Sequence, residues 1–115
     1  MKIVQLDDFK QFSPEKMKKN NLFQTARLFC DVYGFEPGQA QKGHVHGEQD
    51  KVYIVLAGQG IFTIGKEEQV LGAGQGILAP AGEEHGVRNH TAQRLTVLVF
   101  VAPNASSIAA EPHSR

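Results

Sequence analysis

The chain has 115 residues, and 12 Lys plus Arg balance 12 Asp plus Glu, so its formal net charge is zero. This length predicts one domain, and the neutral charge argues against nucleic acid as the main partner. No apolar run approaches the roughly 20 residues that a membrane helix needs, and residues 1–10 lack the apolar stretch of a signal peptide. We therefore expect no membrane association. The single cysteine, Cys30, permits no intrachain disulfide, so we expect a cytoplasmic protein.

Residues 1–25 are expected to form an N-terminal segment that packs on the main domain. Ser13 and Pro14 predict a short helical turn over residues 13–19, because a hydroxyl at the N-cap and proline at the first helical position favour a helix start. The apolar side chains expected to pack on the outside of the domain are Phe9, Phe12, Leu22 and Phe23.

All 12 glycines lie between Gly34 and Gly86, separated by short β-branched and aromatic runs. Glycine marks turns, so this pattern predicts an all-β sandwich or barrel over residues 26–103. The strands are expected at about residues 26–35, 52–56, 61–64, 77–79 and 95–101. Residues 104–115, rich in Ala, Ser and Pro, are expected to form a flexible tail.

Three of the five histidines fall in two glycine-bounded segments. His44 and His46 are two residues apart, which in a strand directs both imidazoles to one face, as a metal ion requires. His85, just after a Pro-Ala-Gly turn, is the candidate for a further ligand. Two solvated surface histidines would give the same short H-x-H pattern, so the surrounding sequence has to decide between these interpretations.

That surrounding sequence carries two motifs. The second motif of the cupin family, G-x5-P-x-G-x2-H-x3-N, is matched at every defined position by Gly74, Pro80, Gly82, His85 and Asn89. The first half of the first cupin motif, G-x5-H-x-H, is matched by Gly38, His44 and His46, and Gly58 corresponds to its last glycine. The chain therefore resembles a small single-domain cupin over most of its length.

The resemblance implies an all-β fold, the double-stranded β-helix or jelly-roll barrel. The short helical segment expected from Ser13 and Pro14 would precede it. It also implies a metal site inside one end of the barrel, formed by His44, His46 and His85. Asn89 is expected to bond the backbone near the turn, and His90 to lie in a surface turn.

The first motif breaks where the cupins usually carry a glutamate, because Asp50 or Lys51 occupies that position. A lysine ammonium has no lone pair for a cation. Gln49 shares a strand face with Lys51 and Tyr53, so its side-chain oxygen is our first choice for the fourth ligand. Asp50 is the second choice and needs a bulge to turn inward. A three-histidine site completed by water is the third.

The missing glutamate affects the charge of the site. A divalent ion held by histidines alone, or with a neutral glutamine, keeps its double positive charge and favours an anionic ligand. We therefore expect one divalent transition metal that binds a small, anionic organic molecule. Imidazole ligands suit Fe, Mn, Ni, Cu or Zn, and the sequence does not choose among them.

Several strand residues are candidates to line the barrel interior: Tyr53, Val55, Phe62, Ile64, Leu78 and Phe100. The hydroxyl of Tyr53 is the best candidate for orienting a ligand or holding a proton. Lys51, if it points inward, is a candidate general acid or anion anchor. The alternative is a solvated lysine at the start of a strand.

Two functions remain open at this point. The first is a metal-dependent enzyme, namely a dioxygenase, isomerase or lyase acting on a small molecule. The second is a non-catalytic module that binds a small ligand or metal as a sensor or storage protein. One fold hosts many chemistries, so the resemblance defines the site better than the reaction. The edge strands of such a barrel also favour a homodimer.

Overall fold

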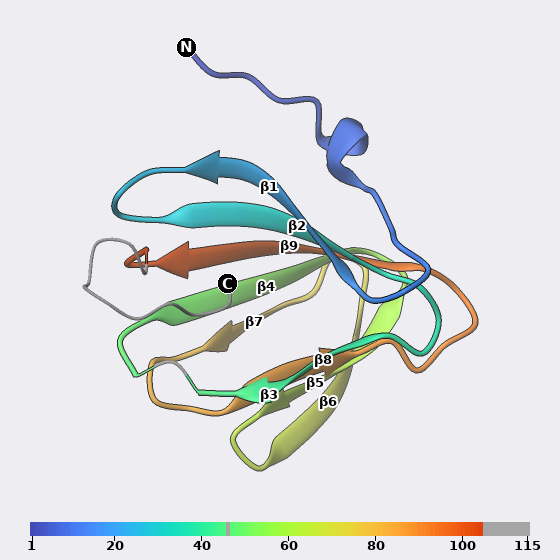
Figure 1. Ribbon diagram of the computed structural model, residues 1–115. Coiled ribbons are helices and arrows are strands. Elements are labelled where there is room, and N and C mark those ends of the chain that lie inside the picture. Colours follow the sequence, from blue (N-terminus) through green and yellow to red (C-terminus); the bar gives the residue numbers. More distant parts are fainter. Residues whose placement is uncertain (46, 105–115) are drawn as a thin grey trace.

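The computed structural model describes residues 1–45 and 47–104, with His44 described by its backbone alone. A single turn of 3-10 helix, η1 (Leu6–Phe9), precedes nine strands in these residues. The strands form two antiparallel sheets that face each other (Figure 1). The five-stranded sheet has the order β1 (Lys18–Gln24), β2 (Phe29–Phe35), β9 (Leu95–Ala102), β4 (Asp50–Ala57) and β7 (Gly76–Ala79). The four-stranded sheet has the order β3 (Ala40–His44), β8 (His85–Arg88), β5 (Gln59–Ile64) and β6 (Glu67–Gly72).

The five predicted strands correspond to β2, β4, β5, β7 and β9. Strand β6 was not predicted, because its first four residues are exposed and include Glu67, Glu68 and Gln69, so they show no apolar alternation. It forms a hairpin with β5 through a turn in which Gly65 has a positive φ of 60°. The left-handed backbone conformation of that turn explains why glycine stands there.

The helical turn predicted over residues 13–19 is wrong. This segment bends and then enters β1, in which Lys19 is the cross-strand partner of Tyr33. A helix of one or two turns gains little stability in water. Pairing with β2 instead buries Asn20 and Leu22, so the tertiary contact prevails over the local helix-start signal.

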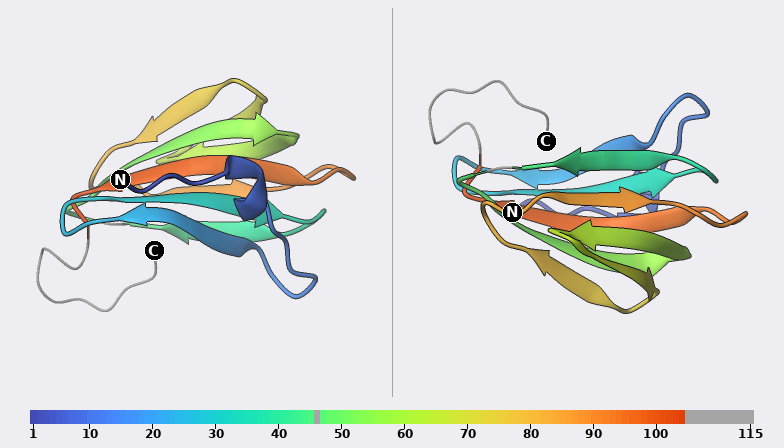
Figure 2. Two further views of the ribbon diagram at one scale, coloured as in Figure 1. Left: turned by 90° about the horizontal axis from the view of Figure 1, so that it is seen from above. Right: turned by 90° about the horizontal axis from the view of Figure 1, so that it is seen from below.

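Two groups of apolar side chains hold the sheets in place. The main core lies between the sheets and includes Phe29, Phe35, Val55, Phe62 and Val97. A second cluster lies on the outer face of the five-stranded sheet, where the N-terminal segment crosses it (Figure 2). Its members are Leu22, Cys30, Val32, Val4, Leu6, Phe9, Phe23, Leu56 and Leu98.

Two residues predicted to line the interior point the other way. Leu78 is 54% exposed and Phe100 is 41% exposed, and each is a cross-strand neighbour of Val52 on the outer face of the five-stranded sheet. The reason is strand alternation, since Ala79, Val99 and Val101 occupy the inward positions of the same strands. Tyr53, Val55 and Phe62 are buried inside as expected, and Ile64 packs against them.

Within the described residues, no helix has the length and apolarity needed to cross a membrane.

Candidate functional site

His85 begins strand β8 directly after a tight turn. Gly82 in this turn has a positive φ of 87°, and Glu83 N donates to Pro80 O over 3.1 Å. The Asp50 carboxylate accepts a hydrogen bond of 2.9 Å from Ala81 N, which ties the turn to the start of β4. The turn delivers His85 into the space between the sheets, where it is only 1% exposed.

The imidazole of His85 is oriented by its own turn. Its Nδ1 atom lies 3.1 Å from the carbonyl oxygen of Glu83. A carbonyl only accepts hydrogen bonds, so this contact places a proton on Nδ1, and when the ring is neutral Nε2 carries the lone pair. This is the form that a metal-ligating histidine takes when a backbone carbonyl orients it. His85 therefore has the chemistry of a metal ligand.

Of the other two predicted histidine ligands, His44 is described by its backbone alone. His44 ends β3 and is the cross-strand partner of His85. The register of β3 and β8 shifts between Gln41 and His44, so an irregularity in the strand precedes the first histidine. His46 lies outside the described residues. Among the side chains that the structure describes, no three from His, Cys, Asp and Glu gather at one point.

The side chains of the two candidates for the fourth ligand, Gln49 and Asp50, point in opposite directions. Gln49 is buried, and its Nε2 donates to the carbonyl of Pro103 over 2.9 Å. Asp50 is exposed, with its carboxylate bound to the 80–83 turn as described above. Alternation along the chain thus directs Gln49 inward and Asp50 outward, as the sequence predicted for a regular strand.

Lys51 and Tyr53 both point into the space between the sheets. Lys51 is 2% exposed and Tyr53 is fully buried. The ammonium of Lys51 lies 5.1 Å from the ring centroids of Tyr53 and of Tyr33. The alternative of a solvated lysine at the strand start is therefore wrong, and Lys51 brings its side-chain nitrogen to the interior.

Tyr53 also contacts the predicted metal ligand. Its ring centroid lies 6.2 Å from that of His85 and 5.5 Å from that of Phe62, both in edge-to-face geometry. Burial, with a smaller contribution from Tyr33, raises the pKa of Tyr53 well above its usual value of 10.0. The hydroxyl therefore keeps its proton at neutral pH and acts as a hydrogen-bond donor.

Gln41 is an interior residue that the sequence did not reveal. Its Oε1 accepts hydrogen bonds from the Tyr53 hydroxyl at 2.8 Å and from Lys51 Nζ at 3.4 Å, and its Nε2 donates to the Tyr33 hydroxyl at 3.5 Å. It thereby links β3 of one sheet to β2 and β4 of the other. Neighbouring polar residues, Gln39 and Lys42, leave no apolar alternation that would have marked position 41 as inward.

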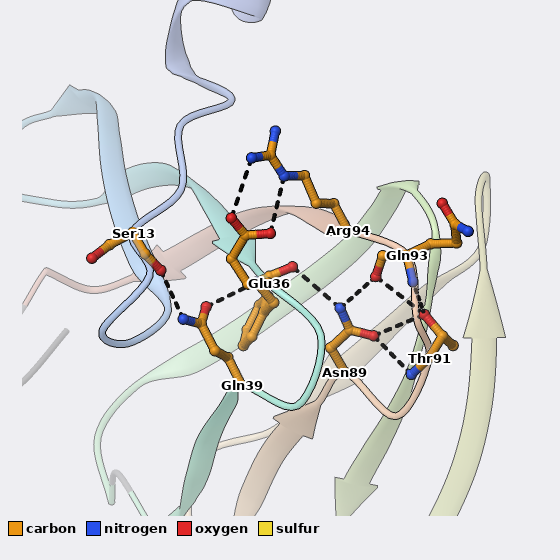
Figure 3. A network of polar contacts seen from close by, with 8 residues as sticks. Ser13, Glu36, Gln39, Asn89, Thr91, Gln93 and Arg94 are labelled. Atoms are coloured by element: carbon orange, nitrogen blue, oxygen red, sulfur yellow. Dashed lines mark hydrogen bonds and ion pairs between the residues drawn. The ribbon is translucent and has the colours of Figure 1, made fainter.

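Asn89, the last residue of the second motif, has a structural role (Figure 3). Its Nδ2 donates to the carbonyls of Phe35 at 3.2 Å and Gln93 at 2.7 Å, while its Oδ1 accepts from the backbone N–H and hydroxyl of Thr91. This confirms that Asn89 bonds the backbone near a turn. His90 beside it is exposed, as predicted.

Comparisons with known proteins agree with this architecture. The family model "Cupin domain" matches residues 31–114. The crystal structure of the TT1209 protein from Thermus thermophilus is similar, with 46% identity, a TM-score of 0.87, and coverage of 90% of this chain and 98% of that one. An RmlC-like cupin from Desulfovibrio desulfuricans shares 28% identity with a TM-score of 0.78, covering 90% of this chain and 97% of that one.

A curated relative is more distant. The oxalate-binding protein of Thermotoga maritima is 27% identical over 73 residues, which are 64% of this chain. The matched part spans 60% of that relative's length. The family match covers well over half of the chain, and two facing antiparallel sheets are the double-stranded β-helix that the motifs predicted. The chain belongs to the cupin domain family.

Proposed function

We propose that this cupin holds one divalent transition metal between its sheets through His44, His46 and His85, with the side-chain oxygen of Gln49 as a fourth ligand. The Nδ1 contact of His85 with Glu83 supports the proposal, because a backbone carbonyl on one ring nitrogen is how metal-ligating histidines are commonly oriented. The backbone pairing of His44 with His85 and the completeness of the second motif agree with it. Asp50 is the less favoured ligand, because its carboxylate would have to leave Ala81.

The molecule bound at this site is, in our proposal, a small organic anion. The observation that carries the proposal is the burial of the Lys51 ammonium against Tyr53, whose ring also contacts His85. Where the family usually has a glutamate, this chain therefore has an interior lysine, whose ammonium form would be stabilised by a bound anion. A bound metal supplies Lewis acidity, and the lysine adds electrostatic attraction for a carboxylate. The name of the Thermotoga maritima relative, an oxalate-binding protein, is consistent with a ligand of this class.

Binding is the function that the geometry supports best, and an enzyme reaction of dioxygenase, isomerase or lyase type is the second candidate. Tyr53 favours the second candidate because its ring contacts His85 and its hydroxyl is protonated at neutral pH. In that case Tyr53 holds the proton near the ligand and Lys51 anchors the anion. A sensor or storage role would need only the binding.

Metal analysis of the purified protein tests the proposal directly. Protein prepared without chelator should contain about one transition metal ion per chain by elemental analysis. His85→Ala should abolish this stoichiometric binding while the far-ultraviolet circular dichroism stays unchanged. His90→Ala is the matched control, since His90 is exposed and should leave the metal content unaltered. Full metal occupancy in His85→Ala would refute the site.

We also propose that the protein is a homodimer that pairs through the outer face of its five-stranded sheet. Val52, Leu78 and Phe100 are cross-strand neighbours there, and the last two are exposed apolar side chains. A cluster of this kind on an outer sheet face is typical of a protein interface. A two-fold axis would bring the same cluster of a second copy against it.

A further inference from the structure

A cleft of about 420 Å³ lies between the N-terminal loop, strand β1 and strand β3. Among the described residues it is lined by Ser13, Lys16, Met17, Lys18, Lys19 and Gln41. Three of these six residues are lysines and none is acidic, although the chain as a whole carries no net charge. A concave surface lined by one sign of charge concentrates ligands of the opposite sign.

The cleft leads to the polar interior rather than lying on an unrelated surface. Gln41, at its wall, is buried and accepts the hydrogen bonds of Tyr53 and Lys51. The ammonium of Lys19 lies 5.7 Å from the centroid of the Tyr33 ring, and that of Lys51 lies 5.1 Å from the same centroid. Lys19 of the cleft and the interior Lys51 therefore approach the same aromatic ring.

The walls of the cleft are held in place by hydrogen bonds. Gln39 Nε2 donates to the carbonyl of Ser13 over 2.7 Å, which fastens the N-terminal loop to the loop before β3 (Figure 3). Lys18 Nζ donates to Gln11 Oε1 over 3.1 Å, and buried Asn20 donates to Gln11 O over 3.1 Å. A cleft that is formed before its ligand arrives does not have to be ordered on binding.

We propose that this cleft is a recognition site for a small organic carboxylate, with the anionic group held by Lys16 and Lys19 and the apolar body resting on Met17. The partly buried methionine favours an organic acid over an inorganic anion, because it offers apolar contact beside the charges. The proposal rests on the proposed function in one respect: the acid received here is taken to be the one that the metal site binds. Gln41 lines the cleft and also accepts the hydrogen bond of the interior Lys51.

The test uses the full chain stripped of metal with EDTA and labelled with nitrogen-15. Benzoate is the probe, and its neutral amide, benzamide, is the control ligand. Benzoate should shift the amide resonances of residues 16–19 and 41, and benzamide should not. Lys19→Met, which keeps most of the apolar stem, should weaken benzoate binding at least tenfold. Lys19→Arg should largely restore it, and Lys66→Met, in the exposed β5–β6 turn, should bind benzoate as the wild type does.

Three results would overturn the proposal. The first is that benzoate does not bind, or that benzamide binds as tightly as benzoate. The second is unchanged benzoate affinity in Lys19→Met, and the third is inorganic phosphate binding as tightly as benzoate. Because the protein in this experiment carries no metal, a failure of the proposed metal site cannot produce any of them. Conversely, an absence of benzoate binding would leave the metal stoichiometry of the wild type and of His85→Ala unaffected. The two proposals can therefore fail separately.

Discussion

The hydroxyl of Tyr53 donates a hydrogen bond of 2.8 Å to the side-chain oxygen of Gln41, across the space between the two sheets. Both residues are buried, and Lys51 donates to the same oxygen. The bond joins the strand that follows the two motif histidines to the strand that contains the first of them. It also fixes the Tyr53 ring, which contacts His85.

Replacing Tyr53 with Phe tests the strength of this link. The variant loses one buried hydrogen bond but keeps the ring and its contacts, so its free energy of unfolding should fall by about 1 kcal/mol. The midpoint of thermal unfolding, measured by circular dichroism, should fall by about 4 °C. Tyr33→Phe is the matched control. It loses the longer contact of 3.5 Å with Gln41 Nε2 and should cost less. Equal losses in the two variants would contradict the assigned importance of the Tyr53 bond.

Lys51→Glu should restore a carboxylate where the cupins usually have one. We expect the variant to bind the metal more tightly than the wild type does. Its metal-loaded form should bind oxalate at least about tenfold more weakly, because a carboxylate that repels the anion replaces the lysine. Lys51→Met, which removes the charge without adding a ligand, should weaken oxalate binding and leave metal affinity close to that of the wild type. Calorimetric titration measures both affinities. Oxalate binding unchanged in Lys51→Glu would exclude an anchoring role for this lysine.

Gln49 and Asp50 should respond differently to truncation. Gln49→Ala should lower the metal affinity by roughly tenfold to a hundredfold, because it removes an inward oxygen. Asp50→Ala should lower the free energy of unfolding by about 1 kcal/mol through the loss of its bond to Ala81, with a smaller effect on metal affinity. Metal titration and thermal unfolding of both variants separate the two roles. The opposite pattern would make Asp50 the fourth ligand.

The thiol of Cys30 should be inert in the folded protein. Burial, followed by the neighbouring carboxylate of Asp31, raises its pKa from 9.0 to about 11. At pH 9 an ordinary thiol is half ionised, whereas a thiol of pKa 11 is about one-hundredth ionised. Iodoacetamide should therefore react with the native protein at least roughly fiftyfold more slowly than with the chain unfolded in urea. Comparable rates would show that Cys30 is accessible and ionised.

The same raised pKa affects stability at high pH. In the unfolded chain the thiol loses its proton near pH 9, while in the folded protein it does so near pH 11. The unfolded state therefore releases its proton first, and the stability contribution present below pH 9 declines as the pH rises from 9 to 11. Cys30→Ala should show a shallower decline in this window by urea unfolding. An identical decline would assign the effect to other groups.

Substitutions on the outer sheet face test the proposed dimer. Leu78→Glu would place a charge in the cluster with Val52 and Phe100, so it should convert a dimer to a monomer in sedimentation velocity experiments. Val70→Glu is the matched control, since Val70 is also exposed but lies on β6 in the other sheet. A monomeric wild type, or a Leu78→Glu variant that still dimerises, would refute this interface.

The strands and the two cupin motifs could be recognised from the sequence because they depend on local patterns. Glycines with positive φ at positions 38, 58, 65, 74 and 82 mark turns whose backbone conformation other residues rarely adopt. Alternation along one strand likewise predicted that Gln49, Lys51 and Tyr53 share a face, and all three are buried. Information of this kind is carried by neighbouring residues and needs no knowledge of the fold.

What the local patterns missed depends on contacts between distant segments. The helix predicted from Ser13 and Pro14 does not form, because β1 pairs with β2. The register of β9 and β7 with β4 places Phe100 and Leu78 on the outer face of the sheet. Gln41 gave no sign of its role, because its partners Tyr33, Lys51 and Tyr53 come from two other strands. The lysine cleft likewise joins residues 13–19 to residue 41. Local sequence governs turns and strand faces, whereas the free energy of packing two sheets together determines which polar side chains meet between them.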